Sequence, residues 1–320
     1  YYQSENASLL CGDCLRLLSL LPDKSVNCCV TSPPYFGLRD YGVDGQIGLE
    51  QTPDEYVAKL VSVFREVKRV LRDDGTLWLN LGDSYVDKGA KGNHKDPKHP
   101  DGRNAQAGVP KNYRVEGLKS KDLIGIPWRV AFALQQDGWY LRQDIIWHKP
   151  NPMPESVRDR CTKAHEYIFL LSKSAKYYFD SEAIQEPLAS SSVARLSQDV
   201  EQQAGSDRVP GKTNGRMKAV YTKPYTGSST KNYADGGAQD ASETKKRIVD
   251  KILSGEISGR NKRSVWTVTT KPFKGAHFAT FPPDLIEPCI LAGCPKDGVV
   301  LDTFNGAGTV GLVAMKHSRK

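Results

Sequence analysis

The sequence predicts an α/β fold, with a sheet whose strands alternate with helices along the chain. Short apolar runs bounded by proline, glycine or aspartate recur through the sequence, and stretches with helical apolar spacing lie between them. A chain of 320 residues with 38% hydrophobic content can also bury a large core. We therefore expect one large α/β domain that is interrupted by a polar insertion.

The first elements form a strand, helix, strand unit. Residues 7–11 predict a short strand, and the apolar spacing of residues 15–21 predicts a helix. Residues 26–31 follow as an apolar strand that lies between Pro22 and Pro33. We expect this unit to start the sheet.

The next unit is a long amphipathic helix followed by a strand. The helix begins at Pro53, which suits a first helical turn, and its apolar side chains recur three or four positions apart. Those side chains are Tyr56, Leu60, Val63, Phe64, Val67 and Val70. We expect Asp73, Asp74 and Gly75 to end the helix and residues 76–81 to form a strand.

A polar stretch follows, and then regular elements return. Residues 83–119 are dense in Gly, Lys, Asp, Asn and His, so we expect a long mobile loop. Residues 126–135 then predict a helix, and residues 140–147 and 167–172 predict two more strands.

A second polar stretch divides the chain into three parts. Residues 189–263 are rich in Ser, Gly, Lys, Gln, Asp and Thr, with few large apolar side chains outside 248–257. They cannot easily bury a core alone, so a disordered insertion and a surface module that orders on nucleic acid are both open. We assign residues 1–188 and 264–320 to the two parts of one α/β domain.

Charge and hydrophobicity indicate the kind of partner and the location that we expect for this protein. The net charge of +8 suits a polyanionic partner, although this surplus is modest. No stretch approaches the ~20 apolar residues that span a bilayer, and the first residues carry no export signal. We therefore expect a cytoplasmic protein without a membrane partner.

The seven cysteines, an odd number, are not arranged like the disulfide framework of a small secreted domain. Cys11 and Cys14 have the CxxC spacing of a redox or zinc site, but no second pair of ligands accompanies them. We therefore expect both to be buried structural thiols, and we expect no metal.

A glycine-rich turn follows the last predicted strand. After a predicted helix over residues 283–292, residues 299–302 form an apolar strand that ends in Asp302, and residues 304–309 lead into a further helix. Such turns let a cofactor approach the backbone closely. The turn also matches the dinucleotide fingerprint, so a nucleotide-cofactor oxidoreductase is the rival interpretation, but the acidic ribose ligand about 20 residues further on has no counterpart before Lys320.

A second motif, Ser32-Pro33-Pro34-Tyr35, lies where an apolar strand ends and a loop begins. The prolines cannot continue a strand ladder, so they make a rigid turn that presents the carbonyl groups of Ser32 and Pro33 and projects the ring of Tyr35. A plain strand-ending turn explains the motif equally well when it is taken alone.

Together the two motifs resemble a family. Residues 32–35 near the N-terminus and residues 302–309 far downstream look like the DNA amino-methyltransferases of the β class. The resemblance covers about residues 8–187 and 264–317. It implies a Rossmann-like sheet with helices on both faces, a circularly permuted motif order, and a target-recognition insertion over residues 189–263.

The resemblance also implies the site residues. Catalysis is expected at Ser32, Pro33, Pro34 and Tyr35. The cofactor S-adenosylmethionine, which leaves as S-adenosylhomocysteine, is expected to contact Asp13, Phe281, Pro282, Asp302, Phe304, Asn305, Gly306, Gly308 and Thr309. DNA is expected to contact Lys149, Asn151, Arg158 and Arg160. The family's acidic ribose ligand follows the glycine helix on a further strand, and no residue up to Lys320 matches it.

The implied activity is methyl transfer to an exocyclic amino group of a base flipped out of double-stranded DNA. Cytosine N4 is favoured because family members with Ser at the position of Ser32 mostly modify cytosine, and adenine N6 is the alternative. Carbon-5 transfer would need a nucleophilic cysteine, and the only Pro-Cys pair ends in Cys289, which we expect in the core. A non-catalytic DNA-binding module is a third interpretation. We expect a prokaryotic or phage restriction-modification setting, and a homodimer is left open.

Overall fold

The computed structural model describes the chain in several stretches, which are residues 2–38, 41–86, 117–191, 247, 250–252, 254–256, 259–271 and 280–320. The chain divides into two compact units, one formed by Tyr1–Ile184 with Arg263–Lys320 and the other by Gln185–Lys262. Most of the predicted loop 83–119 and most of the insertion 189–263 lie outside the described residues.

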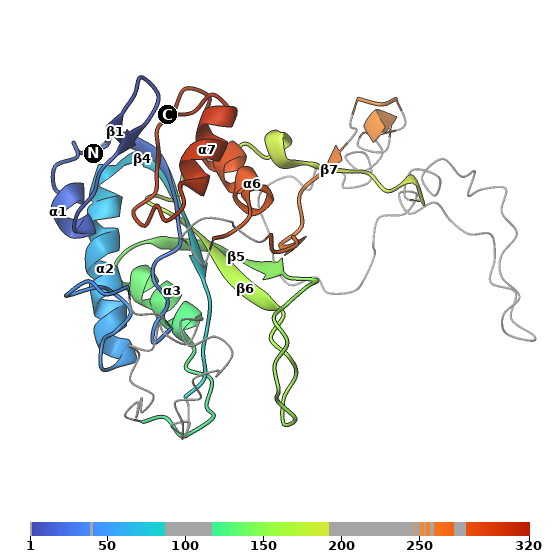
Figure 1. The fold of residues 1–320 in the computed structure, drawn as a ribbon. Coiled ribbons are helices and arrows are strands. Elements are labelled where there is room, and N and C mark those ends of the chain that lie inside the picture. Colours follow the sequence, from blue (N-terminus) through green and yellow to red (C-terminus); the bar gives the residue numbers. More distant parts are fainter. Residues whose placement is uncertain are drawn as a thin grey trace, which may run out of the picture. The chain divides into compact units, whose positions relative to one another are not determined.

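The first unit is built on a six-stranded sheet with the strand order β10-β3-β4-β6-β5-β9 (Figure 1). Its strands are β3 (Val26–Thr31), β4 (Leu71–Leu81), β5 (Tyr140–His148), β6 (His165–Ser172), β9 (Val265–Thr267) and β10 (Val300–Leu301). Strand β6 runs antiparallel to both neighbours, whereas the other adjacent pairs are parallel. The amino end of β6 therefore lies at the edge where the other strands end.

Helices cover both faces of this sheet, as predicted. Helices α1 (Cys14–Leu18), α2 (Pro53–Val70) and α3 (Ile126–Gln136) belong to one buried core, and α6 (Pro283–Gly293) and α7 (Thr309–Lys316) belong to a second. Cys289 is fully buried in the second core, which confirms its expected place. Among the described residues, no helix is both long and apolar enough to cross a membrane.

Helix α2 follows the predicted pattern at its start but not at its end. Thr52 caps it by accepting a hydrogen bond from the Glu55 amide at 3.2 Å, and Pro53 takes the first turn. The prediction that residues 73–75 end the helix is wrong, because the helix ends at Val70 and β4 begins at Leu71. Val70 and Leu71 are both fully buried, so the chain passes directly from helix into sheet.

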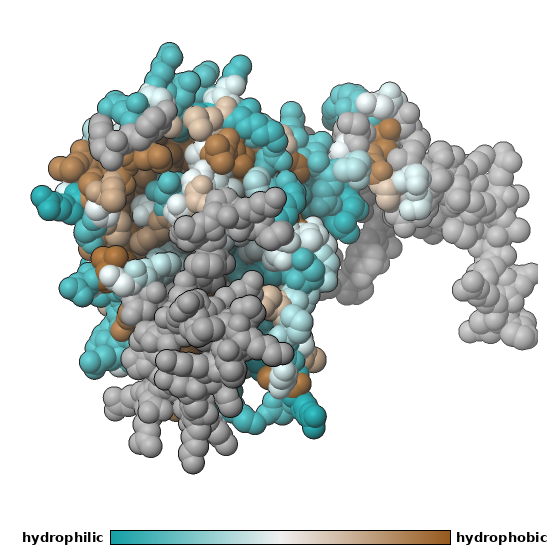
Figure 2. Space-filling model, viewed as in Figure 1, coloured by the Kyte–Doolittle hydropathy of each residue, from teal (hydrophilic) through white to brown (hydrophobic). Residues whose placement is uncertain are grey.

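The N-terminal segment also differs from the prediction. Strand β2 (Ser8–Leu9) pairs with β1 (Tyr2–Gln3) in a separate two-stranded sheet, and α1 is shorter than predicted. Cys11 is exposed and Cys14 is half-buried, so the expectation of two buried thiols is wrong. Hydrophobic residues gather on the surface over this segment (Figure 2), where Leu9, Leu10, Leu15 and Leu20 remain exposed.

The described part of the second unit is small. Strand β7 (Glu186–Pro187) pairs antiparallel with β8 (Gly259–Arg260). The Glu186 carboxylate forms ion pairs with Arg260 at 3.2 Å and with Lys262 at 4.0 Å. These contacts lie between the first and the last residues of the second unit.

Candidate active site

Polar side chains converge at the carboxyl edge of the sheet. Thr31 ends β3, Asn80 lies next to the end of β4, and Asp302 directly follows β10. Glu166 reaches the same edge from the amino end of the reversed strand β6. Ligands of open α/β sheets bind at this edge, so these residues mark the candidate site.

The Asp302 carboxyl is held by short hydrogen bonds. Its Oδ1 accepts from the Thr31 hydroxyl at 2.7 Å and from the Phe304 amide at 3.0 Å, and the Thr303 hydroxyl lies 3.2 Å from that of Thr31. Burial raises the pKa of the Asp302 carboxyl to about 6, although these hydrogen bonds oppose the shift. The group is therefore ionised only above about pH 6.

The glycine turn after Asp302 leaves its backbone open to a ligand. Gly306 and Gly308 have φ angles of +52° and +78°, where other residues are strained. Among the described residues, a Cβ added at Gly308 would have only Asn305 Nδ2 within 4 Å, at 3.9 Å. Helix α7 begins at Thr309 without a side-chain cap, so its first amides suit an anionic group such as a carboxylate.

The turn of residues 32–35 rests on helix α2. The Tyr56 hydroxyl donates a hydrogen bond to the Pro34 carbonyl at 2.8 Å, and the Tyr56 ring packs against Phe36 with centroids 5.5 Å apart. Pro33 is buried, whereas Ser32 is half-buried. Tyr56 therefore belongs to the apolar face of α2 and also holds the turn in place.

Tyr35 is anchored through its hydroxyl group. That hydroxyl donates to Glu166 Oε2 at 2.8 Å and lies 3.1 Å from Asn80 Oδ1. Burial raises the pKa of Tyr35 well above its usual value, the charge of Glu166 adds to the rise, and a hydrogen bond with Ser32 opposes it. The hydroxyl therefore stays protonated and hydrogen-bonded to Glu166. The residue as a whole remains partly exposed.

A family model described as DNA methylase, of the N6/N4 methyltransferase type, matches residues 26–320. The chain belongs to the N6/N4 family of DNA methylases. It is 45% identical over 314 residues to the type II methyltransferase M.Cfr9I of Citrobacter freundii, covering 98% of this chain and 81% of that protein. It is 43% identical over 318 residues to M.SmaI of Serratia marcescens, covering 98% and 85%.

Solved structures agree on the fold of this methyltransferase. The PvuII DNA methyltransferase, cytosine-N4-specific, superposes with a TM-score of 0.54 at 20% identity, covering 100% of this chain and 81% of that one. A Thermus thermophilus DNA modification methylase complexed with S-adenosyl-L-methionine gives 0.50 at 19% identity, covering 97% and 83%. The family confirms the resemblance, S-adenosylmethionine as the cofactor and DNA as the substrate, and it excludes the oxidoreductase interpretation.

The residues present in the methyltransferase fit this cofactor. The open glycine turn, the uncapped start of α7 and the carboxyl of Asp302 lie next to one another along the chain. Elsewhere, Asp13 caps α1 by accepting from the Arg16 amide at 2.9 Å. Phe281 packs against the second core, and Pro282 directly precedes α6. Residues 277–279, which the resemblance also includes, lie outside the described residues.

The four residues expected to contact DNA have different surroundings. Lys149 is not a free surface cation, because its Nζ forms an ion pair with Glu166 and lies 4.2 Å from the centroid of the Trp147 ring. Arg160 forms an ion pair with Glu155 at 2.6 Å. Asn151 hydrogen-bonds the backbone of residue 270, and Arg158 is exposed.

Sequence reasoning missed the residues that connect these groups. Asn80 is the polar residue within the otherwise apolar run 77–81, and Glu166 is the second residue of β6. Lys163 donates to the Asp83 carbonyl at 2.7 Å, and burial lowers the pKa of its amine. A polar residue at the sheet-edge end of an apolar strand is the signal that could have identified Asn80.

Proposed function

We propose that this methyltransferase transfers a methyl group to the exocyclic N4 of a cytosine flipped out of double-stranded DNA. The observation that carries the proposal is the 2.7 Å hydrogen bond between Thr31 and Asp302. Thr31 directly precedes the Ser-Pro-Pro-Tyr turn and Asp302 begins the glycine segment, so this bond holds the base-binding and cofactor-binding motifs side by side.

The catalytic turn would activate a poor nucleophile. The lone pair of the exocyclic nitrogen is delocalised into the base ring. Hydrogen bonds from the amino group to Ser32 Oγ and to the Pro33 carbonyl would favour a pyramidal nitrogen, whose lone pair points at the methyl donor. S-adenosylmethionine would supply the methyl group. As the N–C bond forms and the S–C bond breaks, S-adenosylhomocysteine would leave and one proton of the amine would pass to water.

Tyr35 would hold the base by stacking. Its hydroxyl is occupied by Glu166, so the ring face is the part that is left for a ligand. The target base must leave the duplex, because its paired amino group cannot otherwise meet the methyl group in line. Fixing both reactants contributes much of the rate, since positioned pairs gain ~7–11 kcal/mol over free encounter.

The cofactor would lie along the edge from the glycine turn to α1. Asp302 and the backbone of the turn are suited to the methionine portion, with Phe304, Asn305, Gly306, Gly308 and Thr309 lining it. Asp13 and Phe281 with Pro282 are assigned to the adenine portion. Leu10 and Leu15, which are close to Asp13 in the sequence, have exposed side chains that would offer apolar surface to a purine ring.

The choice of cytosine N4 rests on Ser32 and on the cytosine-N4-specific PvuII enzyme that shares the fold. Unmethylated plasmid DNA treated with the protein and S-adenosylmethionine should yield N4-methylcytosine when its nucleosides are separated by mass spectrometry. N6-methyladenine as the only product would overturn the cytosine assignment and leave the family activity intact.

The role of Tyr35 is tested by its truncation. Tyr35→Ala should lower kcat/KM for DNA at least about tenfold, because base stacking contributes ~1–3 kcal/mol. Cofactor affinity, measured by titration, should change less than about twofold. Tyr140→Ala is the control, because Tyr140 is an exposed tyrosine at the start of β5, at the end of the sheet away from the candidate site. Equal losses of transfer and cofactor affinity in Tyr35→Ala would refute the assignment.

We further propose that residues 189–263 select the target sequence, with Lys149, Asn151, Arg158 and Arg160 nearer to the flipped base. Replacing residues 200–245 with a short Gly/Ser linker should leave cofactor binding intact and remove the preference for one DNA sequence. Arg158→Ala should weaken binding to all sequences and reduce the salt slope by about 0.9. Unchanged site selectivity of the linker variant would place recognition elsewhere, in the 83–119 loop.

A further inference from the structure

We infer that a cradle of positioning residues fixes the plane of the Tyr35 ring, an inference that rests on the proposed stacking role of Tyr35. The cradle consists of Asn80, Gly82, Lys149 and Glu166. These residues come from three different strands or their ends, β4, β5 and β6. They act through Tyr35 and not on the reacting atoms.

Gly82 supports the ring because it has no side chain. A Cβ added at Gly82 would lie 2.5 Å from Tyr35 Cε2, 3.0 Å from Cδ2 and 3.2 Å from Cζ. The ring therefore lies directly against the backbone that follows β4. Gly82 is not among the glycines with positive φ, so close approach of the ring, and not backbone conformation, is what requires glycine here.

Asn80 and Glu166 orient the hydroxyl end of the ring. The Asn80 amide donates to the Tyr167 carbonyl at 3.0 Å and to Glu166 Oε2 at 3.3 Å, which turns its oxygen toward Tyr35. Glu166 Oε2 accepts from the Tyr35 hydroxyl at 2.8 Å. Rotation of the Tyr35 ring is restricted because the ring lies against Gly82 and its hydroxyl lies within hydrogen-bond distance of Asn80 Oδ1 and Glu166 Oε2.

Lys149 holds Glu166 from the other side. Its Nζ is ion-paired with Glu166 Oε1, and only 19% and 16% of the two side chains are exposed. The buried ring of Trp147 lies against the same ammonium group. Each member of the cradle is therefore held by the next, and Tyr35 is the member that faces a ligand.

A double-mutant cycle on the full chain tests the Gly82 contact. Gly82→Ala should lower kcat/KM for unmethylated plasmid DNA about tenfold, because the new methyl group displaces the ring, while S-adenosylmethionine affinity stays within about twofold. In the Tyr35→Ala background the same change should have no further effect, because the space is then free. Losses that add in both backgrounds would overturn the inference.

Gly75→Ala is the matched control. Gly75 lies in β4, the strand that Gly82 directly follows, and its added Cβ would also be crowded, at 3.0 Å from the Arg72 carbonyl. This variant should lower thermal stability equally with Tyr35 or Ala at position 35. Gly82→Ala should instead lower the melting temperature only when Tyr35 is present, which is a readout that does not depend on activity.

Substitutions of Glu166 distinguish a positioning role from a role in proton transfer. Glu166→Ala should reduce kcat/KM about tenfold. Glu166→Gln, which keeps an oxygen acceptor for Tyr35 but loses the ion pair with Lys149, should reduce it only about threefold. Glu287→Gln is the control, because it removes another ion pair between a glutamate and a lysine, with Lys316 at 2.8 Å. If Glu166→Gln is as inactive as Glu166→Ala, an oxygen acceptor for Tyr35 is not what Glu166 supplies, and the inference fails. A parent protein that methylates no amino group would overturn the proposed function instead.

Discussion

The two edges of the sheet carry polar networks of different kinds. At the carboxyl edge, Tyr35, Glu166 and Asp302 are half-buried, and burial shifts the pKa values of Tyr35 and Asp302 upward. At the amino edge, Lys24 and Asp73 form an ion pair at 2.8 Å with 60% and 68% of their side chains exposed. Burial makes the charged form of a group less stable but fixes the orientation of its side chain. The attraction between exposed charges is weakened by the surrounding water.

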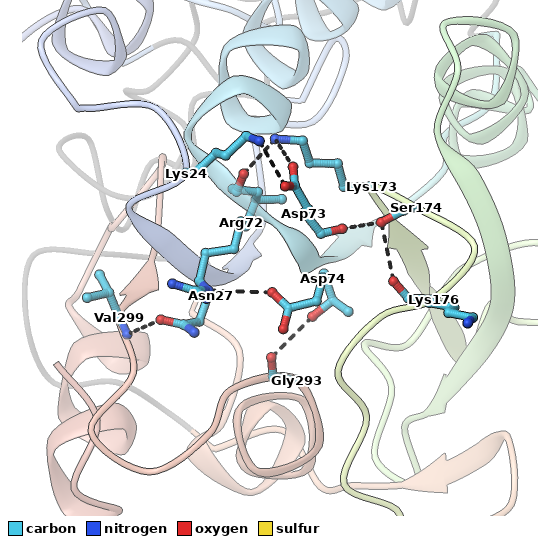
Figure 3. A network of polar contacts seen from close by, with 12 residues as sticks. Lys24, Asn27, Arg72, Asp73, Asp74, Lys173, Ser174, Lys176, Gly293 and Val299 are labelled. Atoms are coloured by element: carbon cyan, nitrogen blue, oxygen red, sulfur yellow. Dashed lines mark hydrogen bonds and ion pairs between the residues drawn. The ribbon is translucent and has the colours of Figure 1, made fainter.

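Figure 3 shows how the amino edge is connected. Lys24 and Lys173 both approach the Asp73 carboxylate, and the Ser174 hydroxyl donates to the Asp73 carbonyl. The Asn27 amide oxygen accepts from the Val299 amide at 2.9 Å. These contacts join the starts of β3, β4 and β10 with the residues that directly follow the end of β6. The comparison supports the proposal that the carboxyl edge binds the ligand, whereas the contacts at the amino edge stabilise the fold.

The largest expected effect is at the glycine turn. Gly308→Val should weaken S-adenosylmethionine binding at least about a hundredfold, or about 2.7 kcal/mol, because a β-branched residue is strained at a φ of +78° and its side chain enters the ligand space. Gly255→Val is the control for strain, since Gly255 has a φ of +80° in the second unit. Equal cofactor titrations for Gly308→Val and the parent would refute the placement of the cofactor.

A smaller effect is expected from the ionisation of Asp302. A cationic ligand favours the carboxylate, so affinity for S-adenosylmethionine should rise as pH increases through about 6, with about a tenfold gain between pH 5 and pH 7. In the absence of ligand, the contribution of Asp302 to folding stability has the opposite dependence on pH. The raised pKa means that the folded protein binds this proton more tightly than the unfolded chain, so the contribution of Asp302 to stability falls as pH rises from about 4 to about 6.

Asp302→Asn checks the pH dependence of cofactor binding, because the amide keeps an acceptor for the Phe304 amide but does not titrate. The variant should show weaker cofactor binding with no step near pH 6, measured by isothermal titration. A step of the same size in Asp302→Asn would assign the titration to another group.

The smallest effect is expected at the amino edge. Asp73→Asn removes the partner of Lys24, which holds the pKa of Asp73 below its ordinary value. Thermal melting should show a slight loss of stability that disappears at about 1 M salt, because both side chains are exposed. Methyl transfer should be unchanged. A loss of transfer comparable with that of Tyr35→Ala would break the distinction between the two edges.

Several elements could be predicted because near neighbours decide them. The apolar run of β3 and the helical spacing of α2 depend on side chains a few positions apart, and their predicted bounds agree with the structure at Val26–Thr31 and at Pro53. The end of α2 was mispredicted because Asp73 and Asp74 look like a helix stop. Their role as the amino edge of β4 depends on pairing with distant strands.

The sequence by itself determined the alternating elements, the two motifs and the resemblance to the DNA methylases, because spacing and glycine chemistry are local properties. The tertiary structure decided which side chains meet. Tyr35 and Glu166 are 131 positions apart, and they touch only because β6 is reversed between β4 and β5. Strand order and direction follow from packing of the whole sheet, so no short window of the sequence contains the information that places Glu166 at the hydroxyl of Tyr35.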